Sequence, residues 1–74
     1  ANDVEVVLYP NPVSSMLNIS TKEVIKRINI FNAAGVLVQT ETQNTFSIVQ
    51  LPTGIYHVQI QTEKGVGAVQ IVKE

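Results

Sequence analysis

The chain has 74 residues, 45% of them hydrophobic, with five basic and six acidic residues and a formal net charge of −1. This length supports one small hydrophobic core, so a single domain over residues 1–74 is expected. The scattered, nearly balanced charge argues against a nucleic-acid-binding surface, and the lack of cysteine excludes disulfides, thiolate metal sites and a cysteine nucleophile.

Neither a membrane helix nor a signal peptide is predicted. No stretch approaches the roughly 18 apolar residues that a membrane helix needs. Residues 1–5 lack the basic and apolar regions of a signal peptide. Two interpretations follow: a cytosolic protein, or a piece of a longer precursor whose export signal lies elsewhere.

Short runs rich in Val, Ile and Thr alternate with turn residues, which is an all-β pattern. In chain order, strands are predicted at residues 4–9, 15–20, 24–32, 36–41, 44–50, 55–62 and 66–73. The expected fold is a small Ig-like antiparallel β-sandwich of about seven strands, with a small barrel as the alternative. Edge strands of such a sandwich can pair with a partner strand or form a strand-paired homodimer.

Turn residues separate the predicted strands. Pro10-Asn11-Pro12 ends the first strand as a stiff corner that cannot continue a hydrogen-bonded ladder. Residues 32–35 predict a hairpin loop with Gly35 in the left-handed conformation. The last hairpin is expected to turn at residues 63–65, where Lys64 and Gly65 supply positive φ values.

Residues 51–54 (Leu-Pro-Thr-Gly) predict a tight corner that leads into a central, half-buried strand. Tyr56, Val58 and Ile60 fall on its buried face at period two, and His57 falls on the other face. The hydroxyl of Tyr56 is expected to find a hydrogen-bond partner at the edge of the sandwich.

Several short motifs stand in a fixed order along the whole chain. They are Tyr9-Pro10-Asn11-Pro12-Val13, Leu17-Asn18-Ile19, Ile28-Asn29-Ile30-Phe31-Asn32 running to Gly35, Leu51-Pro52-Thr53-Gly54-Ile55-Tyr56, and a glycine hairpin leading into Val69-Gln70-Ile71-Val72-Lys73. In this order and spacing, the chain resembles the C-terminal sorting domain (type A) of type IX secretion cargo proteins of the Bacteroidetes.

The resemblance implies a non-enzymatic secretion signal at the C-terminus of a larger exported precursor. The type IX translocon of the outer membrane would recognise the domain in the periplasm and direct the N-terminal cargo domain to the cell surface. A sortase-like peptidase would then cut before the domain and release it outside the cell, and the cargo would be attached to an anionic lipopolysaccharide.

The resemblance also assigns roles to residues. It places the export information in the final hairpin, at Gly65, Gly67, Val69, Ile71, Val72 and Lys73. Members of the family often end in two or more basic residues, whereas here only Lys73 is basic and Glu74 follows it. The other motif residues are expected mainly to maintain the fold: Tyr9, Pro10, Asn11, Pro12, Gly35, Leu51, Pro52, Gly54, Ile55 and Tyr56.

Two other classes of function fit the sequence less well. An accessory module that binds carbohydrate or protein would normally expose several aromatic side chains, but the chain has only two tyrosines and two phenylalanines. An enzyme would need partners for the lone His57, and the acidic residues are isolated from one another. No catalytic residue, metal site or cofactor is therefore predicted.

Overall fold

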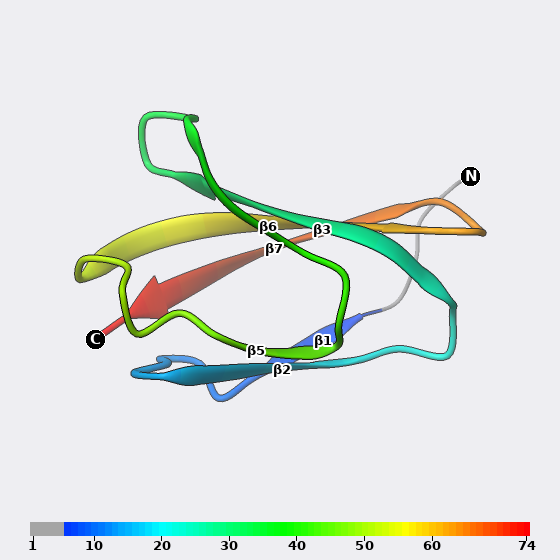
Figure 1. Ribbon diagram of the computed structural model, residues 1–74, viewed down its shortest axis with the longest axis horizontal. Coiled ribbons are helices and arrows are strands. Elements are labelled where there is room, and N and C mark those ends of the chain that lie inside the picture. The colour runs from blue at the N-terminus through cyan, green and yellow to red at the C-terminus, as the bar shows by residue number, and fades with distance from the viewer. Residues whose placement is uncertain (1–5) are drawn as a thin grey trace.

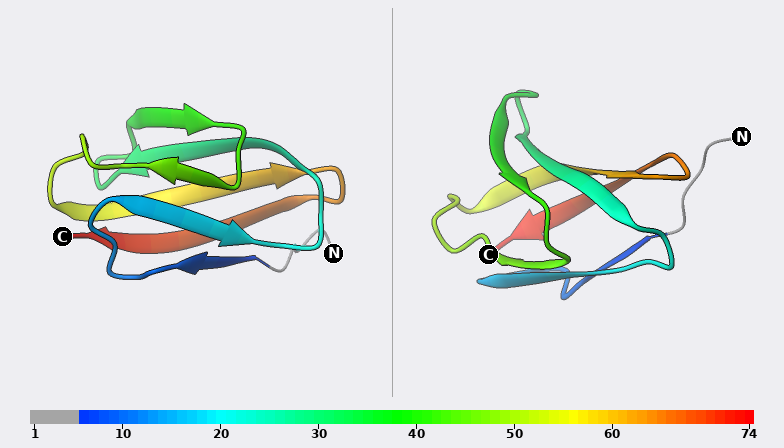
Figure 2. Two further views of the ribbon diagram at one scale, coloured as in Figure 1. Left: turned by 60° about the horizontal axis from the view of Figure 1, so that its bottom comes forward. Right: turned by 45° about the vertical axis from the view of Figure 1, so that its right-hand side comes forward.

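The computed structural model describes residues 6–74, which form two antiparallel sheets packed face to face (Figure 1). One sheet has the order β1-β2-β5, built from β1 (Val7–Tyr9), β2 (Met16–Ser20) and β5 (Thr45–Ser47). The other has the order β4-β3-β6-β7, built from β3 (Ile25–Asn32), β4 (Leu37–Glu41), β6 (Gly54–Thr62) and β7 (Val66–Lys73). The right view of Figure 2 shows the two layers apart, whereas in the left view one sheet lies in front of the other.

The strand order is that of an Ig-like sandwich. If the strands are lettered A, B, C, C′, E, F and G in chain order, the sheets are ABE and C′CFG. The ABE sheet lacks the strand D of a constant-type Ig domain, and C′ adds a fourth strand to the CFG sheet. The predicted Ig-like β-sandwich is confirmed, and the barrel alternative is wrong because, within residues 6–74, no pair of strands links the two sheets.

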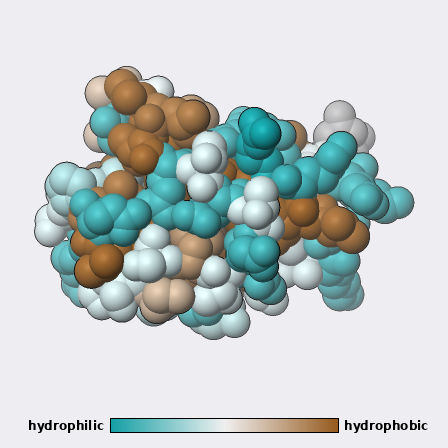
Figure 3. Space-filling view, viewed as in Figure 1, coloured by the Kyte–Doolittle hydropathy of each residue, from teal (hydrophilic) through white to brown (hydrophobic). Residues whose placement is uncertain are grey.

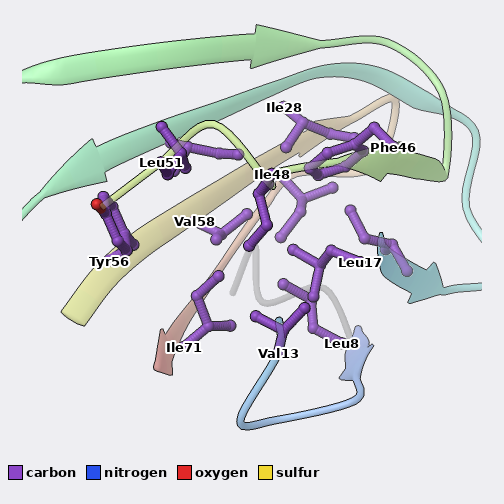
Figure 4. Close-up of a cluster of buried hydrophobic side chains, with 13 residues drawn as sticks. Leu8, Val13, Leu17, Ile28, Phe46, Ile48, Leu51, Tyr56, Val58 and Ile71 are labelled. Carbon is purple, nitrogen blue, oxygen red and sulfur yellow. The ribbon is translucent and has the colours of Figure 1, made fainter. Parts of the chain in front are cut away.

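The core lies between the sheets and follows the predicted period of two. Ile28 and Ile30 of β3 pair in register with Ile60 and Val58 of β6, and all four side chains are buried. Figure 4 shows the cluster, which comprises Leu8, Val13, Leu17, Ile19, Ile28, Ile30, Phe46, Ile48, Leu51, Tyr56, Val58, Ile60 and Ile71. Each fully buried aliphatic side chain contributes roughly 1.5–3 kcal/mol of transfer free energy.

Tyr56 ties the loop before β6 to the sandwich. Its ring is only 5% exposed, and its hydroxyl donates a 2.6 Å hydrogen bond to the carbonyl oxygen of Pro52. Leu51 is buried beneath the same corner, and Gly54 has φ of +156°. A tyrosine at the E–F corner that bonds to the backbone a few residues upstream is a feature of Ig-like sandwiches. The expected hydrogen bond of Tyr56 is thus confirmed.

Two strand boundaries differ from the sequence prediction by more than one residue. The fifth strand covers only Thr45–Ser47 instead of 44–50, because the N–H of Leu51 turns back to the carbonyl of Ile48 at 3.0 Å. The first strand covers Val7–Tyr9, and residues 4 and 5 of the predicted range lie outside the described residues.

The prediction for the last hairpin turn is wrong at Lys64. Among residues 6–74, positive φ occurs only at glycines, namely Gly35 at +82°, Gly54 at +156° and Gly65 at +152°. Thr62 explains the difference, because its hydroxyl oxygen accepts hydrogen bonds from the N–H groups of Lys64 at 3.1 Å and Gly65 at 3.2 Å. These bonds stabilise the turn without a positive φ at Lys64. Gly35 adopts the predicted conformation.

We expect Tyr56→Phe to lower the free energy of unfolding by about 1 kcal/mol, because the Pro52 carbonyl loses its hydrogen bond. Urea denaturation measures this as a lower midpoint with an unchanged slope. Tyr9→Phe is the matched control, since Tyr9 is 51% exposed and should tolerate the change. Equal midpoints for the two variants would show that the Tyr56 hydroxyl contributes nothing to stability.

Candidate functional surface

The strand β7 lies at one edge of the four-stranded sheet. It pairs with β6 without interruption, from Gly54 opposite Lys73 to Gln61 opposite Val66. On its other side the described chain offers only an isolated parallel bridge between Val13 and Lys73. The C-terminal strand is therefore an edge strand of its sheet.

Side chains of β7 alternate between the core and the outer face of the sheet. Ile71 is fully buried and Val69 is half-buried, whereas Val72 is 39% exposed. Lys73 follows the inward set, is only 6% exposed, and donates from Nζ to the backbone oxygen of Glu74 at 2.9 Å. Val69 and Ile71 therefore lie on the inner face of β7, and Ala68, Gln70 and Val72 lie on the outer face.

This alternation bears directly on the residues expected to carry the export information. Of the four with a side chain, only Val72 points away from the core. Gly65 shapes the turn and Gly67 is buried, so neither offers a side chain to a partner. In the folded domain most of these residues set the shape of the hairpin. Their role in export stays a prediction.

The Pro10–Pro12 corner and the following Val13 contact the end of β7, through the Asn11 side chain and the Val13 backbone. The Asn11 side chain accepts a hydrogen bond at Oδ1 from the Val72 N–H (3.0 Å) and donates from Nδ2 to the Gln70 carbonyl (3.4 Å). The N–H of Val13 donates to the Val72 carbonyl at 2.9 Å, and the N–H of Glu74 donates to the Val13 carbonyl at 2.8 Å. Asn11 and Val13 therefore cap the edge over the C-terminal half of β7.

Within residues 6–74, the first half of the same edge has no strand partner. Because both backbone groups of Val72 point away from β6, those of Gln70, Ala68 and Val66 do so too at period two. Within the described part of the chain, no partner satisfies the outward groups of Val66 and Ala68 or the N–H of Gln70. We call the stretch from Val66 to Gln70 the open edge.

The opposite edge, formed by β4, is protected. Its register against β3 shifts between Ile30 and Phe31, which leaves Val38 as an extra bulged residue. Gln39 and Glu41 take the inward positions, and Nε2 of Gln39 donates to the Ser47 carbonyl of β5 at 3.0 Å. Bulges and inward polar side chains are devices that prevent unwanted pairing of edge strands.

The bulge also exposes apolar side chains that sequence reasoning did not single out. Val36, Leu37 and Val38 are all exposed, so buried and exposed side chains do not alternate over these three residues. Figure 3 shows apolar atoms over this hairpin at the upper left of the molecule. Three consecutive apolar residues next to a turn glycine were the available signal.

The remaining candidate groups are His57 and the acidic side chains. His57 is exposed on the outer face of the sheet, as expected. Among residues 6–74 no three His, Cys, Asp or Glu side chains gather as metal ligands would. The same residues contain no helix that is long and apolar enough to cross a membrane.

Comparison with known families decides what this small sandwich is. A family described as the secretion system C-terminal sorting domain matches residues 7–74, which include the corner, both glycine hairpins and all of β7. The chain belongs to this family. No match was found among curated proteins.

Membership of this family assigns the domain a role in secretion. The sorting domain acts as a signal in type IX secretion, and its family is not an enzyme family. Such domains belong to secreted cargo, so the relevant machinery is the secretion system, and the route leads to the outer membrane and the cell surface.

We expect Asn11→Ala to lower the free energy of unfolding by about 1–2 kcal/mol, because the Val72 N–H and the Gln70 carbonyl both lose their partner. Asn11→Asp keeps an oxygen for the Val72 N–H and should lose less. Thermal or urea unfolding of the three proteins checks this order. Equal stability of the alanine and wild-type proteins would contradict the cap.

Proposed function

We propose that residues 1–74 are one sorting domain at the C-terminus of a larger exported precursor. The outer-membrane translocon recognises the folded domain in the periplasm, and the N-terminal cargo crosses to the cell surface. A sortase-like peptidase then cuts before the domain, which is released. Family membership over residues 7–74 carries this proposal.

The β6–β7 hairpin is the proposed point of recognition. It supplies the longest uninterrupted strand pair of the sandwich, and β7 is the edge that the rest of the fold covers only in part. Gly65 fixes the turn, and the inward Val69, Ile71 and Lys73 fix how β7 sits on the core. The translocon would then recognise the shape of the β6–β7 hairpin, the backbone at the edge of β7 and the outward side chain of Val72.

The alternative of a carbohydrate-binding module has little support. Phe46 and Tyr56 are buried in the core. Tyr9 lies on the outer face of the three-stranded sheet and half-buried Phe31 lies on the outer face of the other. These two rings point to opposite sides of the sandwich, so they form no common aromatic platform for a sugar.

A secretion assay tests the proposed function. Residues 1–74 are fused behind a folded reporter that carries an ordinary export signal, in a bacterium with a working type IX system. A second fusion stops at Glu63 and so lacks β7. We expect the full fusion to reach the surface and the shortened one to stay in the periplasm. Retention of the full, folded fusion would refute the proposal.

A pair of glycine variants separates the hairpin's role from general stability. Gly65→Val and Gly35→Val each force a β-branched residue into a positive φ, +152° and +82° respectively. Both should lose about 1–2 kcal/mol of stability. We expect only Gly65→Val to reduce export at a temperature where both domains remain folded. An equal reduction would show that export tracks stability rather than the final hairpin.

A further inference from the structure

We propose that the open edge, the stretch from Val66 to Gln70, binds an extended and uncharged strand of a partner in the export machinery by β-strand addition. This inference rests on the proposed function and deepens it, because it assigns recognition to backbone groups on half of one strand.

Unpaired backbone groups along the open edge favour strand addition. The N–H and C=O groups of Val66 and Ala68 and the N–H of Gln70 point outward and have no partner within residues 6–74. Unpaired groups in a row along a strand are a template for another strand. Farther along, the cap formed by Asn11 and Val13 already uses the same edge through a parallel bridge to Lys73.

Lack of protection is the second argument. The five residues of the open edge carry no charge and no proline, and their register against β6 has no shift. By contrast, β4 has a bulge and inward polar side chains, and β1 and β5 have three residues each. Natural sheets protect exposed edges by such means, so an edge without this protection indicates that it binds another strand.

Incomplete burial of the core on this side is the third argument. Val69 of β7 and Val6, just before β1, pack against the core but are only partly buried. β1 lies against β7 at this side of the sandwich. An added strand would place alternate side chains over the core, so an apolar residue there would complete the cover.

The available length limits the partner strand. The turn at Glu63 and Lys64 bounds the open edge at one end, and Asn11 bounds it at the other. Five residues at about 3.3 Å each leave room for a strand of about 17 Å. A second copy of this chain, paired antiparallel through the same residues, is the competing occupant.

A proline scan of the two edges tests the inference. Ala68→Pro removes one outward N–H, which β6 does not use, and edge strands tolerate proline at such positions. Thr40→Pro is the matched control, because the N–H of Thr40 points outward from the protected edge. Both variants are made in the reporter fusion, and urea midpoints establish that each domain is folded.

We expect Ala68→Pro to lower the surface-to-periplasm ratio of the reporter by about tenfold or more, because the partner's acceptor is left unpaired beside the proline ring. Thr40→Pro should export like the wild type. Equal export of all three, or an equal loss in both variants, would overturn the inference while the proposed function stands. Retention of the wild-type fusion would instead refute the proposed function.

A second pair covers the case in which Ala68→Pro does not fold. Val69→Lys adds an inward charge at the open edge, where the long side chain can reach solvent, and Gln39→Lys does the same on β4. Only Val69→Lys should block export, and normal export of a folded Val69→Lys domain would overturn the inference. Sedimentation of the purified domain tests the competing occupant. If the wild-type domain is a dimer and Val69→Lys dissociates it, the open edge binds a second copy of the chain. That result would overturn the inference of a partner strand from the export machinery.

Discussion

The hydrogen-bonding demand of the outer edge of β7 is the constraint on which the rest of the structure depends. Backbone groups at a sheet edge must bond to something, whether protein or water. At the C-terminal half of β7 the partner is Asn11 and Val13, which are presented by a proline corner that cannot itself extend a ladder. The first and last parts of the sandwich are thereby joined, and Val13 enters the core at the seam.

The cap also illustrates that a motif residue can maintain the fold without being available for contact with a partner. Most motif residues are accounted for by the fold: Tyr56 holds the E–F corner, Gly35 and Gly65 shape turns, and Asn11 caps β7. Even Lys73, the one basic residue near the end, faces inward. In this domain the motif residues therefore build a folded shape with one edge that residues 6–74 cover only in part, and few of them expose a side chain.

Sequence patterns among neighbouring residues predicted the fold well, but they did not predict the long-range contacts. Alternation placed Ile28, Ile30, Val58 and Ile60 in the core, because strand periodicity is a property of neighbouring residues. The pairing of Asn11 with Gln70 and Val72 spans about sixty residues of chain, so no local pattern contains it. The bulge at Val38 and the burial of Lys73 likewise depend on how the sheets meet.

Amide hydrogen exchange along β7, measured by NMR on the isolated domain, tests whether one half of the β7 edge is capped and the other half is open. We expect slow exchange at Gly67, Val69 and Ile71, whose N–H groups face β6, and fast exchange at Val66, Ala68 and Gln70. Val72 breaks the alternation and should exchange slowly, because Asn11 accepts its N–H. Fast exchange at Val72, or slow exchange along the whole strand at low protein concentration, would contradict a capped half and an open half of one edge.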